Sequence, residues 1–269
     1  MRDRPTGHSD AVGAAPGRDD WDRHWDEYAS SASENPAQEF RRRLILQLLG
    51  DVGPASRVLD IGSGTGDLAA TLRVAHPDAE LLGLELSRSG VELSRRKVPG
   101  AVFLRRDLSV EDSPPAEYRA WATYAVCSEV LEHVDDPCRL LVNSRPYLVP
   151  GCRLVVTVPG GPMTSYDRHI GHRKHYRPDE LAELLRSAGF DVIRATGAGF
   201  PVFNLYRLLM RLLGTRLIDV ASSGEPSRLA GAAMSTFAFV LRLNTRLSPR
   251  GWQIVAVARA PSSPEGARG

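Results

Sequence analysis

The sequence predicts an α/β fold built on a doubly wound, mostly parallel sheet of seven strands. Two observations lead to this prediction. Between residues 57 and 196, short apolar runs alternate with amphipathic segments, which is the pattern of parallel strands joined by crossover helices. In addition, an early apolar run ends in a glycine-rich turn that opens a helix, and a final apolar run at 251–259 supplies a last strand.

The individual elements follow from the periodicity of apolar residues and from the residues that stop each run. We expect strands at 57–61, 80–85, 101–105, 122–127, 153–158, 191–196 and 251–259. We expect helices at 40–49, 66–74, 88–97, 136–146 and 178–188.

Two segments lie outside this alternation. Residues 1–20 are rich in Gly, Pro, Asp and Arg, so we expect a disordered tail followed by one domain over 21–269. Residues 201–249 form a helical insertion before the last strand, with apolar stretches flanked by arginines. Three interpretations of the insertion remain open: a lid or core-packing element, a homodimer interface, and peripheral contact with a membrane surface.

Composition limits the possible classes of function. The chain has 269 residues and a formal charge of +2 from 34 basic and 32 acidic side chains, so charge gives no reason to expect a nucleic-acid partner. Three widely spaced cysteines do not make a disulfide framework and are typical of a reducing compartment. No apolar run approaches the roughly 18 residues of a membrane span. We therefore expect a cytoplasmic protein without a transmembrane segment.

The most informative stretch is Val58–Ala69, in which Asp60 ends an apolar run and three alternate glycines follow, Gly62, Gly64 and Gly66. Glycine allows a close approach of the backbone to a ligand, and the helix start that follows presents unpaired N–H groups. Dinucleotide sites have G-x-G-x-x-G instead, which disfavours the alternative of an NAD-dependent oxidoreductase. Asp60 and Asp67 suit a ligand with positive charge.

This turn resembles the first motif of the class I S-adenosylmethionine (SAM)-dependent methyltransferases, whose fold is Rossmann-like. The resemblance implies that the turn binds the methionine part of SAM and that Asp107 lies beside the adenine. Glu85, at the end of the second strand, can accept hydrogen bonds from the ribose hydroxyls; alternatively it is an acid near a helix N-terminus that Ser87 caps. The expected cofactor-binding residues are Asp60, Gly62, Ser63, Gly64, Gly66, Glu85, Leu86, Asp107, Leu108 and Ser128.

The segment Cys127–Val134 resembles the fourth motif of small-molecule methyltransferases. Its Glu129, Glu132 and His133 share one face if the turn is helical, and two carboxylates with an imidazole could hold a divalent metal. A similar Glu-x-x-Glu-His segment binds one in ubiquinone-biosynthesis O-methyltransferases and in small-RNA terminal 2′-O-methyltransferases. The alternative is that the glutamates favour a helix N-terminus and that His133 only lines a pocket.

A second histidine-rich segment supplies further candidates, since His169, His172 and His175 fall within seven residues. Imidazole titrates near neutrality, so His172 or His133 could accept a hydroxyl proton as the catalytic base. Any further metal ligand would also come from this loop. The segment from Gly171 to Phe190 resembles methyltransferases of natural-product and glycan pathways.

We therefore expect methyl transfer from SAM to a small-molecule acceptor, at the oxygen of a hydrophobic or glycosylated metabolite. A carbon methyltransferase of the quinone type is the alternative within the same class. Near the N-terminus, Trp21, Trp25 and Tyr28 share one helical face; this segment either packs on the core or, as in many methyltransferases, folds over the cofactor or acceptor.

Overall fold

The computed structural model describes residues 21–23, 25, 36–164, 167–168, 170–209, 239–241 and 244–262. The predicted tail, Tyr28, His169 and most of the predicted insertion lie outside these residues. One seven-stranded sheet has the order β3-β2-β1-β4-β5-β7-β6. The five strands β1 to β5 are parallel, and β7 runs antiparallel between β5 and β6. The predicted doubly wound, mostly parallel sheet is therefore confirmed.

The strands lie close to their predicted positions: β1 (Arg57–Ile61), β2 (Glu80–Glu85), β3 (Val102–Arg105), β4 (Ala122–Ser128), β5 (Leu148–Pro159), β6 (Asp191–Ala198) and β7 (Gln253–Arg259). The helices are α2 (Pro36–Leu49), α3 (Asp67–Ala75), α4 (Arg88–Lys97), α5 (Pro137–Ser144) and α7 (Pro178–Ser187), with 3-10 turns η1 (Ala116–Tyr118), η2 (Leu131–His133) and η3 (Arg145–Tyr147).

Several boundaries differ from the sequence prediction by two residues or more, among them the start of α2, which lies at Pro36 rather than at residue 40. The helix expected at 136–146 ends at Ser144 and continues as the 3-10 turn η3, because Pro146 has no N–H group for an α-helical hydrogen bond. Strand β5 starts at Leu148 rather than at residue 153. Pro150 and Gly151 interrupt its apolar pattern, and its pairing with β4 shifts register between Ala122 and Tyr124.

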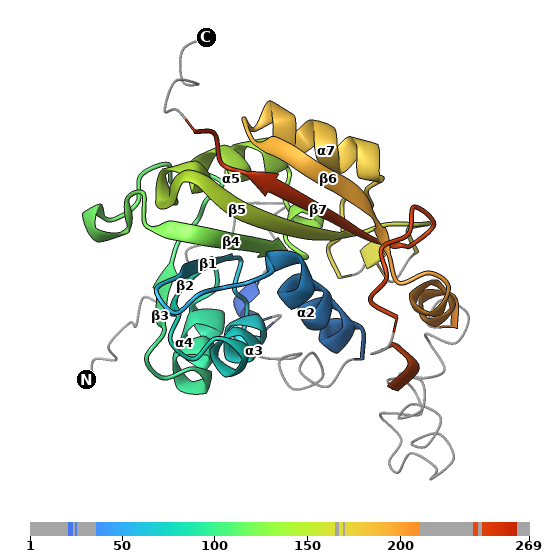
Figure 1. Ribbon diagram of the computed structural model, residues 1–269, viewed down its shortest axis with the longest axis horizontal. Helices are drawn as coiled ribbons and strands as arrows, with labels where there is room; N and C mark the ends of the chain where they lie inside the picture. Colours follow the sequence, from blue (N-terminus) through green and yellow to red (C-terminus); the bar gives the residue numbers. More distant parts are fainter. Residues whose placement is uncertain are drawn as a thin grey trace, which may run out of the picture.

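Helices cover both faces of the sheet, with α2, α3 and α4 on one face and α5 and α7 on the other (Figure 1). Neighbouring residues of β1 pack on opposite faces of the sheet. Val58 packs on the face that α2, α3 and α4 cover, and Leu59 packs on the face that α5 and α7 cover. A strand buried on both faces has a nearly continuous apolar sequence, which explains why the sequence prediction found β1 so readily.

The start of the predicted insertion packs on the core through residues 202–209, which are helical. Phe203 from this helix stacks on Phe40 of α2, with ring centroids 4.9 Å apart, and both side chains are buried. None of the helices in the described part of the chain has the length and apolar character needed to cross a bilayer. The lid, homodimer and membrane-contact interpretations of the rest of the insertion stay predictions.

The Phe40–Phe203 stack yields a first prediction. Phe40 is fully buried, so Phe40→Ala removes a large apolar side chain and leaves a cavity, and we expect a loss of about 3–5 kcal/mol in the free energy of unfolding. Urea denaturation followed by circular dichroism measures it. The control is Val74→Ala on α3, where the side chain is 85% exposed and the change should stay within about 0.5 kcal/mol. Equal midpoints for both variants would contradict the prediction.

Candidate functional site

The candidate site lies at the carboxyl ends of the parallel strands, where ligands bind in open α/β sheets. After β1, the chain folds over the end of β2, because Gly62 N and Ser63 N both donate to the Leu84 carbonyl, at 2.8 and 3.0 Å. Strand β4 ends beside β1 at Ser128. The predicted cofactor residues of the turn and of β2 are therefore brought to one edge.

The turn requires glycine at two positions for different reasons. Gly62 has φ of +72°, and a Cβ there would lie 2.4 Å from Val130 Cγ2. Gly66 has φ of +79°, and its Cβ would lie 3.0 Å from the backbone of Ser94 in α4. Ser94 also donates its hydroxyl to the Gly64 carbonyl at 2.9 Å, a contact that the sequence prediction missed because α4 is distant in the chain.

Glu85 is buried at the end of β2 and bridges the turn to α4. Its carboxylate accepts hydrogen bonds from Gly64 N at 2.8 Å and Ser87 N at 2.9 Å. Ser87 is also the N-cap of α4, since its hydroxyl accepts from Gly90 N at 3.0 Å. Burial raises the pKa of Glu85, against the opposing effect of the two N–H donors. Ser87 therefore caps α4 as predicted, and Glu85 lies at the end of β2 as predicted, so the two interpretations of this segment do not exclude each other.

Two buried polar atoms beside Glu85, Asp60 Oδ2 and Ser63 Oγ, have no hydrogen-bond partner within the described residues. Burial, followed by the charge of Glu85, raises the pKa of Asp60 to about 7. Buried polar atoms are normally hydrogen-bonded, so these two fit a ligand that donates hydrogen bonds and carries positive charge. An α-ammonium group, as in SAM, meets both requirements.

The sequence analysis expected Asp67, like Asp60, to suit a positively charged ligand, but the Asp67 carboxylate is occupied by other groups of the protein. Its carboxylate forms an ion pair with Lys97 of α4 at 3.0 Å and accepts the hydroxyl of Thr65 at 2.7 Å. As the first residue of α3, it also lies where a negative charge is favoured by the helix dipole. Asp67 therefore joins α3 to α4, and the positive ligand is left to Asp60.

The N-terminal aromatic residues lie over this turn. A Cβ built at Gly64 would be 3.0 Å from the indole of Trp25, and Trp21 meets the ring of His133 edge-on, with centroids 4.8 Å apart. Asp22 anchors the segment by accepting from Ser87 Oγ at 2.6 Å and Ser89 N at 3.1 Å. Trp21 and Trp25 therefore connect the glycine turn to His133.

The remaining predicted cofactor residues also lie beyond the strand ends, with contacts of their own. Asp107 accepts from Ser109 N at 3.0 Å, and Leu108 is buried in the core, where its carbonyl accepts from Asn143 at 2.8 Å. Ser128 Oγ lies 2.9 Å from Thr157 Oγ1. Leu86 is half-buried. Their roles toward a cofactor stay predictions.

Glu129 does not join Glu132 and His133 as the sequence prediction required. Its φ is +56°, so the backbone turns away before η2 begins at Leu131, and the three residues do not share one helical face. Its carboxylate is instead engaged by Arg41 at 3.3 Å, Gln253 Nε2 at 2.9 Å and Thr157 Oγ1 at 3.1 Å. Of the possible metal ligands Glu129, Glu132 and His133, Glu129 is therefore engaged by other groups and does not share a face with the other two.

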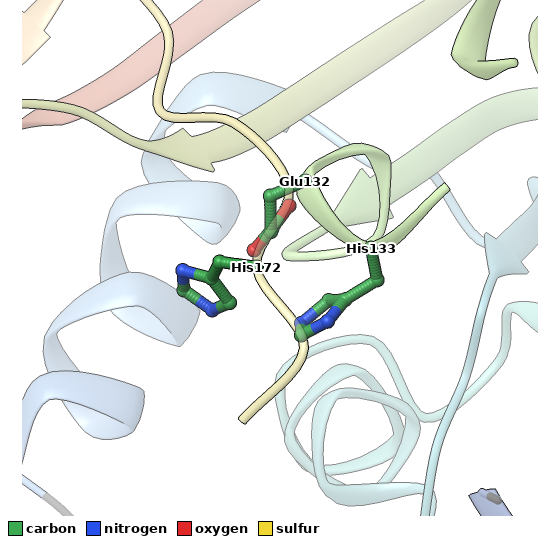
Figure 2. A group of neighbouring side chains, drawn as sticks. All are labelled: Glu132, His133 and His172. Carbon is green, nitrogen blue, oxygen red and sulfur yellow. The ribbon is translucent and has the colours of Figure 1, made fainter. Parts of the chain in front are cut away.

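His172, rather than Glu129, lies beside Glu132 and His133. One ligand atom from each of Glu132, His133 and His172 lies within 4.8 Å of the others, and Figure 2 shows the three side chains converging. Glu132 is fully buried, and neither carboxylate oxygen has a hydrogen-bond partner in the described part of the chain. Burial, followed by the charge of Glu129, raises its pKa well above the usual range. One carboxylate and two imidazoles fit a divalent cation.

The histidine loop docks on η2 through Arg173 and Tyr176. Arg173 N donates to the Glu132 carbonyl at 2.7 Å, its guanidinium donates to the His133 carbonyl, and Tyr176 Oη donates to the Leu131 carbonyl at 3.2 Å. This docking brings the His172 and His133 ring centroids to 4.7 Å. Burial lowers the pKa of His172 to about 4, so the ring is neutral at physiological pH and has one unprotonated nitrogen.

Comparison with known proteins agrees with this geometry. A family model described as a methyltransferase domain matches residues 33–195. The chain is 28% identical to the O-methyltransferase cnsE of Penicillium expansum over 225 residues, which cover 76% of the chain and 80% of the relative. It is 27% identical over 173 residues to the ubiquinone biosynthesis O-methyltransferase of Hahella chejuensis, covering 58% and 71%.

The fold is also that of a solved structure, the geranyl diphosphate C-methyltransferase from Streptomyces coelicolor A3(2). The TM-score is 0.60 at 14% identity, and the match covers 92% of this chain and 99% of the other. At this identity the likeness concerns the fold alone. The methyltransferase family match decides against the alternative of an NAD-dependent oxidoreductase.

The pKa of Asp60 yields a prediction for cofactor binding. A bound ammonium group favours the ionised carboxylate and so lowers this pKa below its value of about 7 in the free protein. The affinity for S-adenosylhomocysteine should therefore be highest above pH 7 and fall as the pH drops through 7, by up to about tenfold per pH unit. Calorimetric titration over a pH series measures it.

Asp60→Asn should flatten this pH profile, whereas the matched variant Ser63→Ala should retain its slope. A wild-type affinity that stays constant or rises toward acid pH would show that Asp60 does not face the ammonium group.

Proposed function

The chain belongs to the class I SAM-dependent methyltransferases, and on that premise we propose that it methylates an oxygen atom of a small hydrophobic or glycosylated metabolite. The observation that carries the proposal is the pair of adjacent imidazoles, His133 and His172, whose rings meet edge-on with centroids 4.7 Å apart. A neutral imidazole has one unprotonated nitrogen, which can accept a hydrogen bond from a hydroxyl group and take its proton as the methyl group is transferred.

For the cofactor, we propose that the glycine turn and the end of β2 bind SAM. The unpartnered Asp60 carboxyl and Ser63 hydroxyl favour the methionine end, and Glu85 lies where the ribose hydroxyls are expected. The complete proposed set is Asp60, Gly62, Ser63, Gly64, Gly66, Glu85, Leu86, Asp107, Leu108 and Ser128.

For the chemistry, SAM supplies a methyl group that the sulfonium charge has already activated. The chain then has to orient the acceptor, exclude water and remove the hydroxyl proton. We propose His172 or His133 as the group that takes this proton. Trp21, which packs against His133, helps to keep water away from the two rings.

Methylation at carbon, as in quinone biosynthesis, is the alternative within the family. The two imidazoles favour oxygen, since a hydroxyl is deprotonated by a nearby base, and two relatives that match much of the chain are named O-methyltransferases.

The test is methyl transfer from isotopically labelled SAM into a metabolite extract, with the product analysed by mass spectrometry. We expect the label on an oxygen atom; label on carbon would support the alternative, and no labelled product would contradict the proposal. His172→Ala or His133→Ala should lower turnover by about 10²-fold, as for a lost general base, with unchanged S-adenosylhomocysteine affinity. His76→Ala, at the C-cap of α3, is the control.

As the alternative to a base at His172, we propose a divalent cation at Glu132, His133 and His172, on the evidence of the buried, unpartnered Glu132 carboxylate. A cation bound to His172 would occupy the ring lone pair that a base needs, so the two roles exclude each other. A ligand that binds only the folded state raises the melting temperature by mass action. Magnesium, manganese or zinc should therefore stabilise the EDTA-treated wild type, and the isosteric variant Glu132→Gln should lose that response. If no cation shifts the wild-type melting temperature, Glu132 is a protonated acid and not a metal ligand.

A further inference from the structure

His175 and the backbone of Gly161 lie behind His172, on the side of its Nδ1 atom. His172 Nδ1 is 3.1 Å from Nε2 of His175, and His175 Nδ1 is 3.1 Å from the carbonyl oxygen of Gly161. The His172 and His175 side chains are 7% and 5% exposed. Burial at this level favours neutral rings, each with a single N–H group.

The Gly161 carbonyl, at the far end of this series of hydrogen bonds, is held in place by the backbone. Gly161 has φ of +72°, and a Cβ there would lie 2.7 Å from the ring of Trp252. The preceding residue, Gly160, donates its N–H to the Trp252 carbonyl at 2.8 Å. The Gly161 carbonyl is therefore a fixed acceptor, and the glycine pair of this turn permits its position.

The position of the proton on each histidine ring follows from the Gly161 carbonyl as the acceptor. A carbonyl oxygen can only accept, so His175 must carry its proton on Nδ1. A neutral ring then has a bare Nε2, which can only accept from the N–H at Nδ1 of His172. The proton of His172 is thus placed on Nδ1, and its Nε2 has a free lone pair.

Asp167 does not compete for these protons. It lies 4.0 Å from His172 Nδ1 and 3.8 Å from His175 Nε2, beyond hydrogen-bond length. Its carboxylate is engaged by Thr164 N at 2.7 Å, Thr164 Oγ1 at 2.8 Å and Arg207 at 3.4 Å. Asp167 therefore lies beside both rings without a hydrogen bond to either of them.

We propose that His175 is a positioning residue: fixed by the Gly161 carbonyl, it selects the tautomer of His172 in which Nε2 is unprotonated. The inference deepens the proposed function, since only that tautomer allows His172 Nε2 to accept the hydroxyl proton. A proton on Nε2 would abolish this role.

The test is a long-range ¹H–¹⁵N correlation spectrum of histidine-labelled protein at neutral pH, in which protonated and bare ring nitrogens have different ¹⁵N shifts. We expect His172 to show a protonated Nδ1 and a bare Nε2. His175→Phe keeps the ring volume but removes the acceptor, and it should move His172 toward the Nε2–H tautomer. His175→Gln offers an amide oxygen as acceptor and should restore the wild-type spectrum. An Nε2–H tautomer of His172 in the wild type would overturn the proposal.

Measurement of turnover in the His175 variants provides a second test. His175→Phe should lower turnover by about 10- to 100-fold, with unchanged affinity for S-adenosylhomocysteine and recovery in His175→Gln. Equal losses in both variants would indicate a packing role and would also overturn the proposal. The two levels of inference fail separately: absence of methyl transfer in the wild type contradicts the proposed function, whereas the tautomer of His172 is measured without any acceptor.

Discussion

The backbone turn from Gly62 to Gly66 is the constraint on which the rest of the site depends. It reverses the chain over β2 through the Leu84 carbonyl, starts α3, and offers the Gly64 N–H to Glu85. Three positive φ angles in five residues are accessible at little cost only to glycine. A side chain at Gly62 or Gly66 would collide with Val130 or Ser94, so the turn also sets how closely η2 and α4 approach.

Around this turn lie four carboxylates, of which Asp60, Glu85 and Glu132 are buried and Glu129 is partly buried, and their charges are compensated unequally. Glu85 is hydrogen-bonded by backbone N–H groups, and Glu129 is paired with Arg41 and Gln253. Glu132 has no such partner within the described residues, and Asp60 lacks one at Oδ2. Burying an uncompensated charge is costly, which is why we propose that these two acids meet a ligand. Perturbed carboxylates of this kind cluster at functional sites.

Glu129 shows how an apparent ligand becomes a structural residue. Its left-handed backbone costs on the order of 1–3 kcal/mol, and the carboxylate offsets that cost by joining α2, β5 and β7 at the end of β4. The same backbone turn allows η2 to present Glu132 and His133 toward the histidine loop. The proposed cation site therefore includes His172, from a different segment, in place of Glu129.

The sequence by itself determined the doubly wound sheet, the glycine turn, the acid at the end of β2 and the cap at Ser87. These features are local, because period-two and period-3.6 patterns and positive-φ glycines leave their mark on neighbouring residues. Only the tertiary structure decided the pairing of Asp67 with Lys97, the diversion of Glu129 to Arg41, and the chain from Gly161 through His175 to His172. Those contacts join residues whose spacing along the chain carries no periodic signal, so they exist only once the sheet brings its strand ends and loops together.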